Sequence, residues 1–236
     1  MTFEITSGVV KQPQKILLYG TPGIGKTQLC SQNPDTLFLD LESGSLNFDV
    51  SRVLGITKFN EYVKAVMEFA SNEKYKTLVV DSLTKIEAMV TNQLLEEKGW
   101  DSLEKPGYGK GYEELKQRFM RVIAGCDYLV SKGKNIIIVA HCVVKPFMDP
   151  SGEQYDRYQP DCQKQILPIL LSQMDSIFFY QWRKITVEAE KGDRYIAKGS
   201  GDRELFTQER PAFIAKSRQV MEVSYLNPKK EFWTCL

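Results

Sequence analysis

The sequence predicts an α/β fold in which a mainly parallel central sheet is flanked by helices and extended by antiparallel strands near the C-terminus. Two observations support this prediction. Up to His141, short apolar runs rich in β-branched and aromatic residues alternate with amphipathic stretches of helical period. After His141, strand-like runs follow one another with turn residues between them. Alternating strands and helices favour a parallel sheet, whereas successive short strands favour an antiparallel one.

The elements of the first part follow in regular order. Buried strands are predicted where short apolar runs are bounded by polar residues, at 15–20, 36–41, 76–82 and 134–141. Helices are predicted where apolar residues recur at helical spacing, at 59–73, 83–98 and 112–133. A further helix is expected to begin at Thr27, directly after a glycine-rich loop.

The later part of the chain predicts a smaller set of strands, which we expect at 176–190, 193–200, 203–207 and 212–217. Two segments, 99–111 and 143–164, are rich in glycine, proline and aromatic residues and show no strand or helix pattern. Irregular segments of this length are usually functional or disordered. The chain has no repeat or linker, so we expect a single domain over 1–236, with a short leader at 1–13 and a tail at 223–236.

Composition narrows the class of protein. The 31 basic residues nearly balance the 30 acidic ones, so any nucleic-acid surface must be a local patch. The five cysteines are odd in number, widely spaced and form no CxxC pair, which favours reduced thiols over disulfides or a zinc site. The sequence has no signal-peptide pattern and no apolar run long enough to span a bilayer. We therefore expect a cytoplasmic protein with no membrane partner.

The stretch "GTPGIGKT" after the first predicted strand has the GxxxxGKT pattern of a phosphate-binding loop. In such a loop backbone N–H groups surround the phosphates, the lysine neutralises their charge, and the threonine hydroxyl binds magnesium. The alternative is a glycine turn that matches by chance. The pattern predicts ATP and Mg²⁺ as cofactors, held by Gly20, Pro22, Gly23, Ile24, Gly25, Lys26, Thr27 and Gln28.

Polar residues end the other predicted strands at the same edge of the sheet. Asp81 could reach the magnesium ion, and the alternative is a helix cap. Asp40 and Glu42 follow the neighbouring strand; Glu42 lies farther along, so we take it as the base that activates water, with solvated turn residues as the alternative. His141, the only histidine, could sense the γ-phosphate or simply be a satisfied edge residue.

The segments "GTPGIGKT", "LDLE", "VVDS" and "VAH", in this order, resemble the core of RecA-type ATPases. More narrowly, the chain resembles phage-encoded AAA-type ATP-binding proteins, including RecA-like single-strand annealing and recombination ATPases. This resemblance runs from about residue 14 to about residue 222 and includes "YDRYQP" and "RELFTQERPAFIAKSR". It implies a RecA-like P-loop NTPase core and a location in the host cytoplasm.

The resemblance also implies two DNA-facing loops, at 99–111 and 143–164. Their aromatic side chains could stack on bases and their cations could contact phosphates. The second segment also holds four acidic residues, so a plain polar loop is the alternative. The candidate DNA-binding residues are Lys105, Tyr108, Lys110, Lys145, Phe147, Arg157, Tyr158 and Lys164.

In ring-forming RecA-like ATPases, a KxR pair on a late strand reaches the neighbouring subunit's nucleotide. By this resemblance Lys216 and Arg218 are catalytic candidates, with Lys26, Glu42, Asp81 and His141, and the alternative is a solvated basic pair. The resemblance therefore implies a homo-oligomer, either a ring or a short filament.

The function that follows is DNA-stimulated ATP hydrolysis by a protein that binds single-stranded DNA in phage recombination, annealing or replication. A single-strand-binding protein is a possible further partner. Two alternatives stay open from the residues alone. One is a P-loop kinase of nucleotides or small molecules, and the other is a non-catalytic, ATP-gated replication loader or scaffold.

Overall fold

The computed structural model describes residues 7–8, 10–150, 152–188 and 195–234, and the structural statements below concern these residues. The strands are β1 (Lys15–Gly20), β2 (Thr36–Asp40), β3 (Ser51–Val53), β4 (Thr77–Asp81), β5 (Asn135–Met148), β6 (Gln154–Pro160), β7 (Ser176–Glu188), β8 (Tyr195–Phe206), β9 (Lys216–Ser217) and β10 (Ser224–Leu226). The helices are α1 (Lys26–Ser31), α2 (Phe59–Ala70), α3 (Leu83–Lys98), α4 (Lys110–Ser131), α5 (Leu167–Gln173) and α6 (Lys230–Thr234). Among these, no helix combines the length and apolar character needed to cross a membrane.

A single sheet organises the chain, with the strand order β10-β8-β7-β1-β5-β4-β2-β3. The pairs from β7 through β3 are parallel, whereas β8 and β10 add antiparallel strands beyond β7. The predicted fold class, a mainly parallel α/β sheet with antiparallel strands near the C-terminus, is confirmed. The strand β5 lies between β1 and β4, so the glycine loop and Asp81 follow strands that are not direct neighbours.

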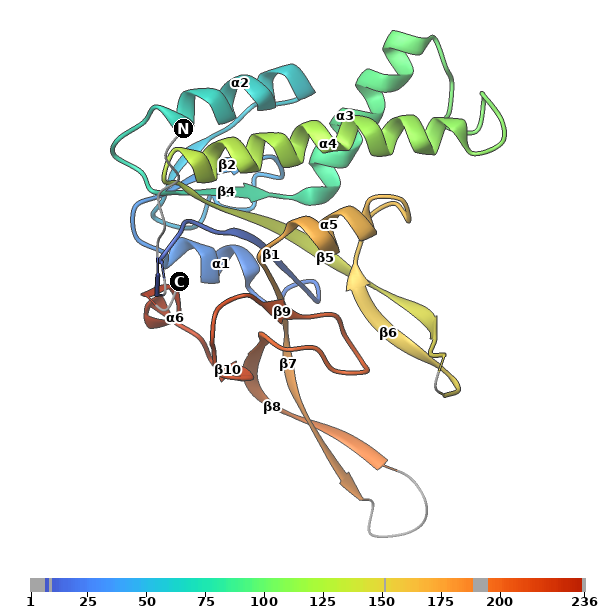
Figure 1. The fold of residues 1–236 in the computed structure, drawn as a ribbon. Coiled ribbons are helices and arrows are strands. Elements are labelled where there is room, and N and C mark those ends of the chain that lie inside the picture. The colour runs from blue at the N-terminus through green and yellow to red at the C-terminus, as the bar shows by residue number, and fades with distance from the viewer. Residues whose placement is uncertain (1–6, 9, 151, 189–194, 235–236) are drawn as a thin grey trace.

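Helices cover both faces of the sheet, and alternate strand residues fill two separate cores. On β1, Leu17 and Tyr19 face the core formed with α2, α3, α4 and α5. Ile16 and Leu18 face the opposite core, to which α1 and α6 contribute. Figure 1 shows α2, α3 and α4 on one side of the sheet and α1 on the other. Burial of both faces explains why the parallel strands read as nearly continuous apolar runs.

The segment 143–164, to which the sequence assigned no element, is largely a β-hairpin. The strand β5 continues past the sheet to Met148, and β6 pairs with it in antiparallel register from Cys142↔Pro160 to Met148↔Gln154. This hairpin and the longer pair β7–β8 extend from the body of the molecule (Figure 1). The runs predicted at 193–200 and 203–207 belong to the one strand β8, and only Lys216–Ser217 of the run at 212–217 is a strand.

The C-terminal segment is packed against the body of the molecule. Phe232 and Trp233 on α6 are buried in the core shared with α1. The indole Nε1 of Trp233 donates a hydrogen bond to the carbonyl oxygen of Leu29 at 2.9 Å. Residues within 223–236, which the sequence presented as a tail, therefore help to fix the short helix α1.

We expect Trp233→Ala to lower the free energy of unfolding by about 3–5 kcal/mol, because it removes a buried ring and leaves a cavity beside α1. Trp233→Phe keeps an aromatic ring but loses the bond to Leu29, and should cost about 1–2 kcal/mol. Urea unfolding followed by circular dichroism measures both. Tyr108→Ala is the matched control, because that ring is fully exposed and its loss should change stability by less than about 0.5 kcal/mol. Equal effects of the Trp233 and Tyr108 variants would contradict the packing role of α6.

Candidate functional site

The glycine loop joins the end of β1 to the start of α1 and is fixed by close backbone packing. A Cβ atom on Gly20 would lie 1.9 Å from the carbonyl oxygen of Tyr180 on β7, so no side chain fits there. Gly23 and Gly25 have positive φ angles of 71° and 93°, which glycine adopts without strain. The loop can therefore turn back on itself and present its backbone N–H groups at the N-terminus of α1.

Lys26 lies inside this loop. Its Nζ donates hydrogen bonds to the carbonyl oxygens of Gly20, at 2.9 Å, and of Thr21, at 3.1 Å. The side chain is buried, and this desolvation lowers the pKa of its ammonium group. The loop thus holds a cation at its centre, where an anionic ligand would be bound.

Thr27 and Asp81 form the oxygen pair expected of a magnesium site. Thr27 Oγ1 donates a hydrogen bond of 2.7 Å to Asp81 Oδ2. Burial raises the pKa of Asp81, and the bond from Thr27 partly opposes this. A Cβ on Gly44 would lie 3.8 Å from Thr27 Oγ1 and 4.0 Å from Asp81 Oδ2, so the loop after β2 lies close to the same two oxygens. Hydroxyl and carboxylate oxygens suit Mg²⁺, which completes its coordination with water and phosphate oxygens.

The two acidic residues after β2 have different environments. Asp40 is buried and accepts hydrogen bonds from Gly44 N at 3.0 Å, Ser45 N at 2.8 Å and Ser45 Oγ at 2.6 Å. Burial alone would raise the pKa of Asp40, but the bonds from Ser45 and neighbouring backbone groups together lower it. Asp40 therefore folds the loop that carries Glu42 and has little capacity left for a ligand.

Glu42 lies among the polar groups at the strand ends. Ser82 donates a hydrogen bond to Glu42 Oε1, and His141 Nε2 lies 3.4 Å from Glu42 Oε2. Glu42 and His141 both remain partly exposed. The structure thus brings together a carboxylate after β2 and an imidazole on β5, next to the Thr27–Asp81 pair.

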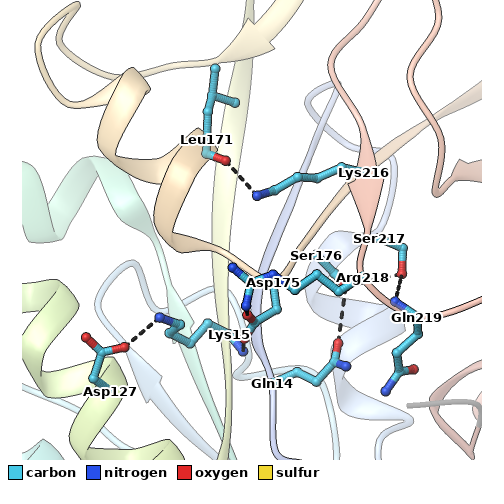
Figure 2. A network of polar contacts seen from close by, with 10 residues as sticks. All are labelled: Gln14, Lys15, Asp127, Leu171, Asp175, Ser176, Lys216, Ser217, Arg218 and Gln219. Carbon is cyan, nitrogen blue, oxygen red and sulfur yellow. Dashed lines mark hydrogen bonds and ion pairs between the residues drawn. The ribbon is translucent and has the colours of Figure 1, made fainter. Parts of the chain in front are cut away.

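The Lys216–Arg218 pair lies at the opposite end of the sheet. Its strand β9 pairs with the first residues of β7, whose partners on β1 lie three to four residues before Gly20, about 10–13 Å along the strand. Lys216 Nζ donates to the carbonyl oxygen of Leu171 at 2.6 Å, and Arg218 forms an ion pair with Asp175 at 2.7 Å (Figure 2). Within one chain, this pair is therefore separated from the glycine loop.

Four of the DNA-binding candidates are on the surface. Tyr108 is fully exposed in the turn before α4, Lys110 begins that helix, and Lys164 is exposed after β6. Lys105 is also exposed and forms a surface ion pair with Asp101 at 2.6 Å. Lys145 is half-buried on β5. These cations and this aromatic ring are accessible to a ligand, to differing degrees.

The other candidates pack against the protein itself. Arg157 is buried, with Glu209 and the carbonyl oxygen of Phe213 as hydrogen-bond partners and the Phe147 ring 4.9 Å from its guanidinium. The Tyr158 ring stacks on Phe179 with 5.2 Å between centroids. Arg157 thus uses its charge to fasten the hairpin to residues 209–213, and its role as a phosphate ligand stays a prediction.

Two features of this region escaped the sequence analysis. Ser45 orients Asp40, and its only signal was its place in the loop after a predicted strand. Arg203, on β8, reaches the glycine loop and donates a hydrogen bond to Gln28 at 2.6 Å. No motif marks Arg203, because the contact depends on how β8 pairs with β7.

Comparison with known proteins identifies the family of the chain. The model of a family described as an AAA domain matches residues 12–219. No curated protein matches the sequence. Among solved structures, a KaiC-like protein from the hyperthermophilic archaeon Pyrococcus horikoshii OT3 is similar, with 13% identity, a TM-score of 0.48 and coverage of 91% of this chain and 85% of that one. With the family model matching most of its length and a phosphate-binding loop within the match, the chain belongs to the AAA domain family and is a P-loop domain of the ATPase type.

Proposed function

We propose that this protein hydrolyses ATP and uses the hydrolysis to act on single-stranded DNA in recombination, annealing or replication, as its resemblance to phage-encoded RecA-like ATPases implies. The observation that carries the hydrolytic part is the position of Glu42. This carboxylate lies beside the Thr27–Asp81 oxygen pair and is oriented from both sides, by Ser82 and by His141. A general base must be held near the reacting phosphate in this way.

Each side chain has a defined task in this proposal. The Lys26 ammonium balances the charge of the β- and γ-phosphates, and the Thr27 hydroxyl and Asp81 carboxylate hold Mg²⁺, which supplies further charge neutralisation when bound. Glu42 accepts a proton from the attacking water. His141, on the neighbouring strand end, donates to Glu42 or to the γ-phosphate and so distinguishes the triphosphate from the diphosphate.

The DNA part of the proposal is supported by the path of β5. This strand carries His141 in the site and continues without a break to Met148 in the hairpin. In this proposal, a movement of His141 on nucleotide binding shifts the backbone of β5 and with it the hairpin. At the start of α4, Tyr108 and Lys110 add a fully exposed ring and an exposed cation, the side-chain types that stack on bases and pair with phosphates.

Assembly into a homo-oligomer is part of the same proposal. Lys216 and Arg218 lie at the end of the sheet opposite the glycine loop. They could act only on the nucleotide of a second copy, packed head to tail, as a ring or a short filament provides. Measurement of the solution mass with and without ATP tests for such assembly.

The kinase alternative has less support from these side chains. A phosphate-covering lid needs several accessible arginines. The segment 143–164 has only Arg157, which is buried against Glu209 and Phe147.

The loader alternative differs from the proposed function in its rate of ATP hydrolysis: it predicts tight ATP binding with negligible turnover. Steady-state ATP turnover, with and without a single-stranded oligonucleotide, separates these functions, and phosphate transfer to nucleoside monophosphates would favour the kinase.

Replacing the proposed base should separate binding from turnover. We expect Glu42→Gln to reduce kcat by a factor of about 10²–10⁴ while ATP affinity stays within about threefold, because only proton transfer is lost. Single-turnover hydrolysis and equilibrium ATP binding measure the two effects. Glu68→Gln, an exposed carboxylate on α2, is the control and should behave as wild type. Unchanged turnover in Glu42→Gln would exclude this residue as the base.

The exposed turn before α4 should contribute to DNA affinity. We expect the double change Tyr108→Ala and Lys110→Ala to weaken binding of a single-stranded oligonucleotide at least about tenfold and to reduce its salt dependence, since a stacking surface and a phosphate contact are lost. Filter binding over a range of salt concentrations measures this.

Basal ATP turnover of the same double variant should be unchanged. Lys132→Ala, at the other end of α4, removes a cation at a distance and should keep wild-type DNA affinity. If the double variant and the control bind DNA equally well, this surface does not bind DNA.

The raised pKa of Asp81 gives a pH dependence of Mg²⁺ binding. Because burial favours the protonated acid, Asp81 takes up its proton at higher pH than an exposed aspartate would. Only the ionised carboxylate binds Mg²⁺, so Mg²⁺-dependent ATP affinity should fall as the pH drops through this raised pKa. Asp81→Asn should weaken that affinity and flatten its pH profile. Comparing both proteins at each pH removes the titration of ATP itself, and identical profiles would contradict the ligand role of Asp81.

A further inference from the structure

We propose that Arg203, on β8, is a second cationic ligand of the nucleotide's phosphate chain, supplied by the same chain that provides the glycine loop. This inference rests on the proposed ATP-binding function and adds a binding residue to the same site. It places an arginine on the side of the loop away from Asp81 and Glu42.

The pairing of β7 with β8 fixes where Arg203 lies. In the antiparallel register, Tyr180 is opposite Leu205 and Trp182 is opposite Arg203. Tyr180 and Leu205 are buried in the core that contains Leu29 of α1, so their face of the sheet is the one α1 covers. Alternate residues share a face, so Trp182 and Arg203 come next along it. Of the two, Arg203 reaches the glycine loop, at Gly25.

The guanidinium of Arg203 lies directly against the loop. Its Nη1 donates a hydrogen bond of 2.6 Å to Gln28 Oε1, on the residue after the magnesium-binding threonine. A Cβ atom on Gly25 would lie only 2.5 Å from the same nitrogen. The absence of a side chain at Gly25 thus gives this cation access to the N-terminal end of α1, where backbone N–H groups receive phosphates.

Arg203 is held in this position by surrounding groups. Its guanidinium lies 5.2 Å from the centre of the Trp182 ring, as in a cation–π contact. Its backbone N–H donates to Asn227 Oδ1 at 2.8 Å, and its carbonyl oxygen accepts from Asn227 N at 2.7 Å. Burial raises the pKa of the Tyr180 hydroxyl, and its hydrogen bond with Arg203 opposes this shift. These contacts orient the arginine before any ligand arrives.

The charge of Arg203 is available for an anion. The bond to Gln28 and the contact with Trp182 are both with uncharged groups, and none of the ion pairs in the described ranges of the chain includes Arg203. On the other side of the loop there are three carboxylates, those of Asp40, Glu42 and Asp81, and one cation, the ammonium group of Lys26. An anionic ligand therefore gains from a second cation, and phosphate oxygens form stronger bonds with a guanidinium than an amide oxygen does.

Equilibrium binding of ATP and of inorganic tripolyphosphate, both with Mg²⁺, tests this inference. We expect Arg203→Ala to weaken both ligands about 10–100-fold, the range for losing a charged hydrogen bond. Arg203→Lys, which keeps the charge, should recover part of the affinity. Arg121→Ala, an exposed arginine on α4 across the sheet, is the matched control and should bind both ligands as wild type does.

The outcomes separate this inference from the proposed function. If the wild-type protein and Arg121→Ala fail to bind ATP, the proposed function itself is wrong. If they bind ATP and Arg203→Ala binds it equally well, only the role of Arg203 is refuted. Loss of ATP affinity with unchanged tripolyphosphate affinity would also refute it, because the contact would then be with the nucleoside. Thermal unfolding of Arg203→Ala and Arg203→Lys should stay close to wild type; partial recovery in the lysine variant distinguishes a lost charge from a damaged fold.

Discussion

The parallel register of β2, β4, β5 and β1 is the constraint on which the candidate site depends. In this register Asp40 is opposite Asp81, and Gly20 is opposite His141. Parallel strands end at one edge, so four segments far apart in the sequence deliver their polar residues to the same place. A slip of one residue in any pair would exchange the two buried faces of that strand, and the apolar side chains on both faces prevent it. Core packing thus sets the positions of the polar groups.

Much of this arrangement could be predicted from the sequence, for a physical reason. Strands buried on both faces must be apolar along their length, so the runs that contain Leu17 and Ile138 stand out from their polar boundaries. The GxxxxGKT pattern marked the loop, and the order of strand ends marked Asp81, Glu42 and His141. The roles of these side chains remain predictions. The structure adds that Asp40 is held by Ser45, whereas Glu42 is held by Ser82 and His141.

Other features could not be predicted, because they depend on contacts between distant segments. The hairpin β5–β6 has one exposed face and contains prolines, so its pattern resembled that of a loop. The sequence could not distinguish the buried Arg157, which fastens the hairpin, from Arg203, which reaches the glycine loop. The Arg203–Gln28 bond joins residues 175 positions apart. Such a contact follows only from strand pairing, which local sequence patterns do not specify.

The bond between Trp233 and Leu29 has a consequence for the order in which the site is completed. The helix α1 has only six residues, too few to be stable alone, and it is secured by a side chain 204 positions later in the chain. During synthesis the glycine loop emerges early, yet the helix that supports it has its last partner only when α6 has been made. The packing that supports the glycine loop is therefore completed late in synthesis. It also joins the two halves of the chain thermodynamically, because a ligand of the loop stabilises the C-terminal helix as well.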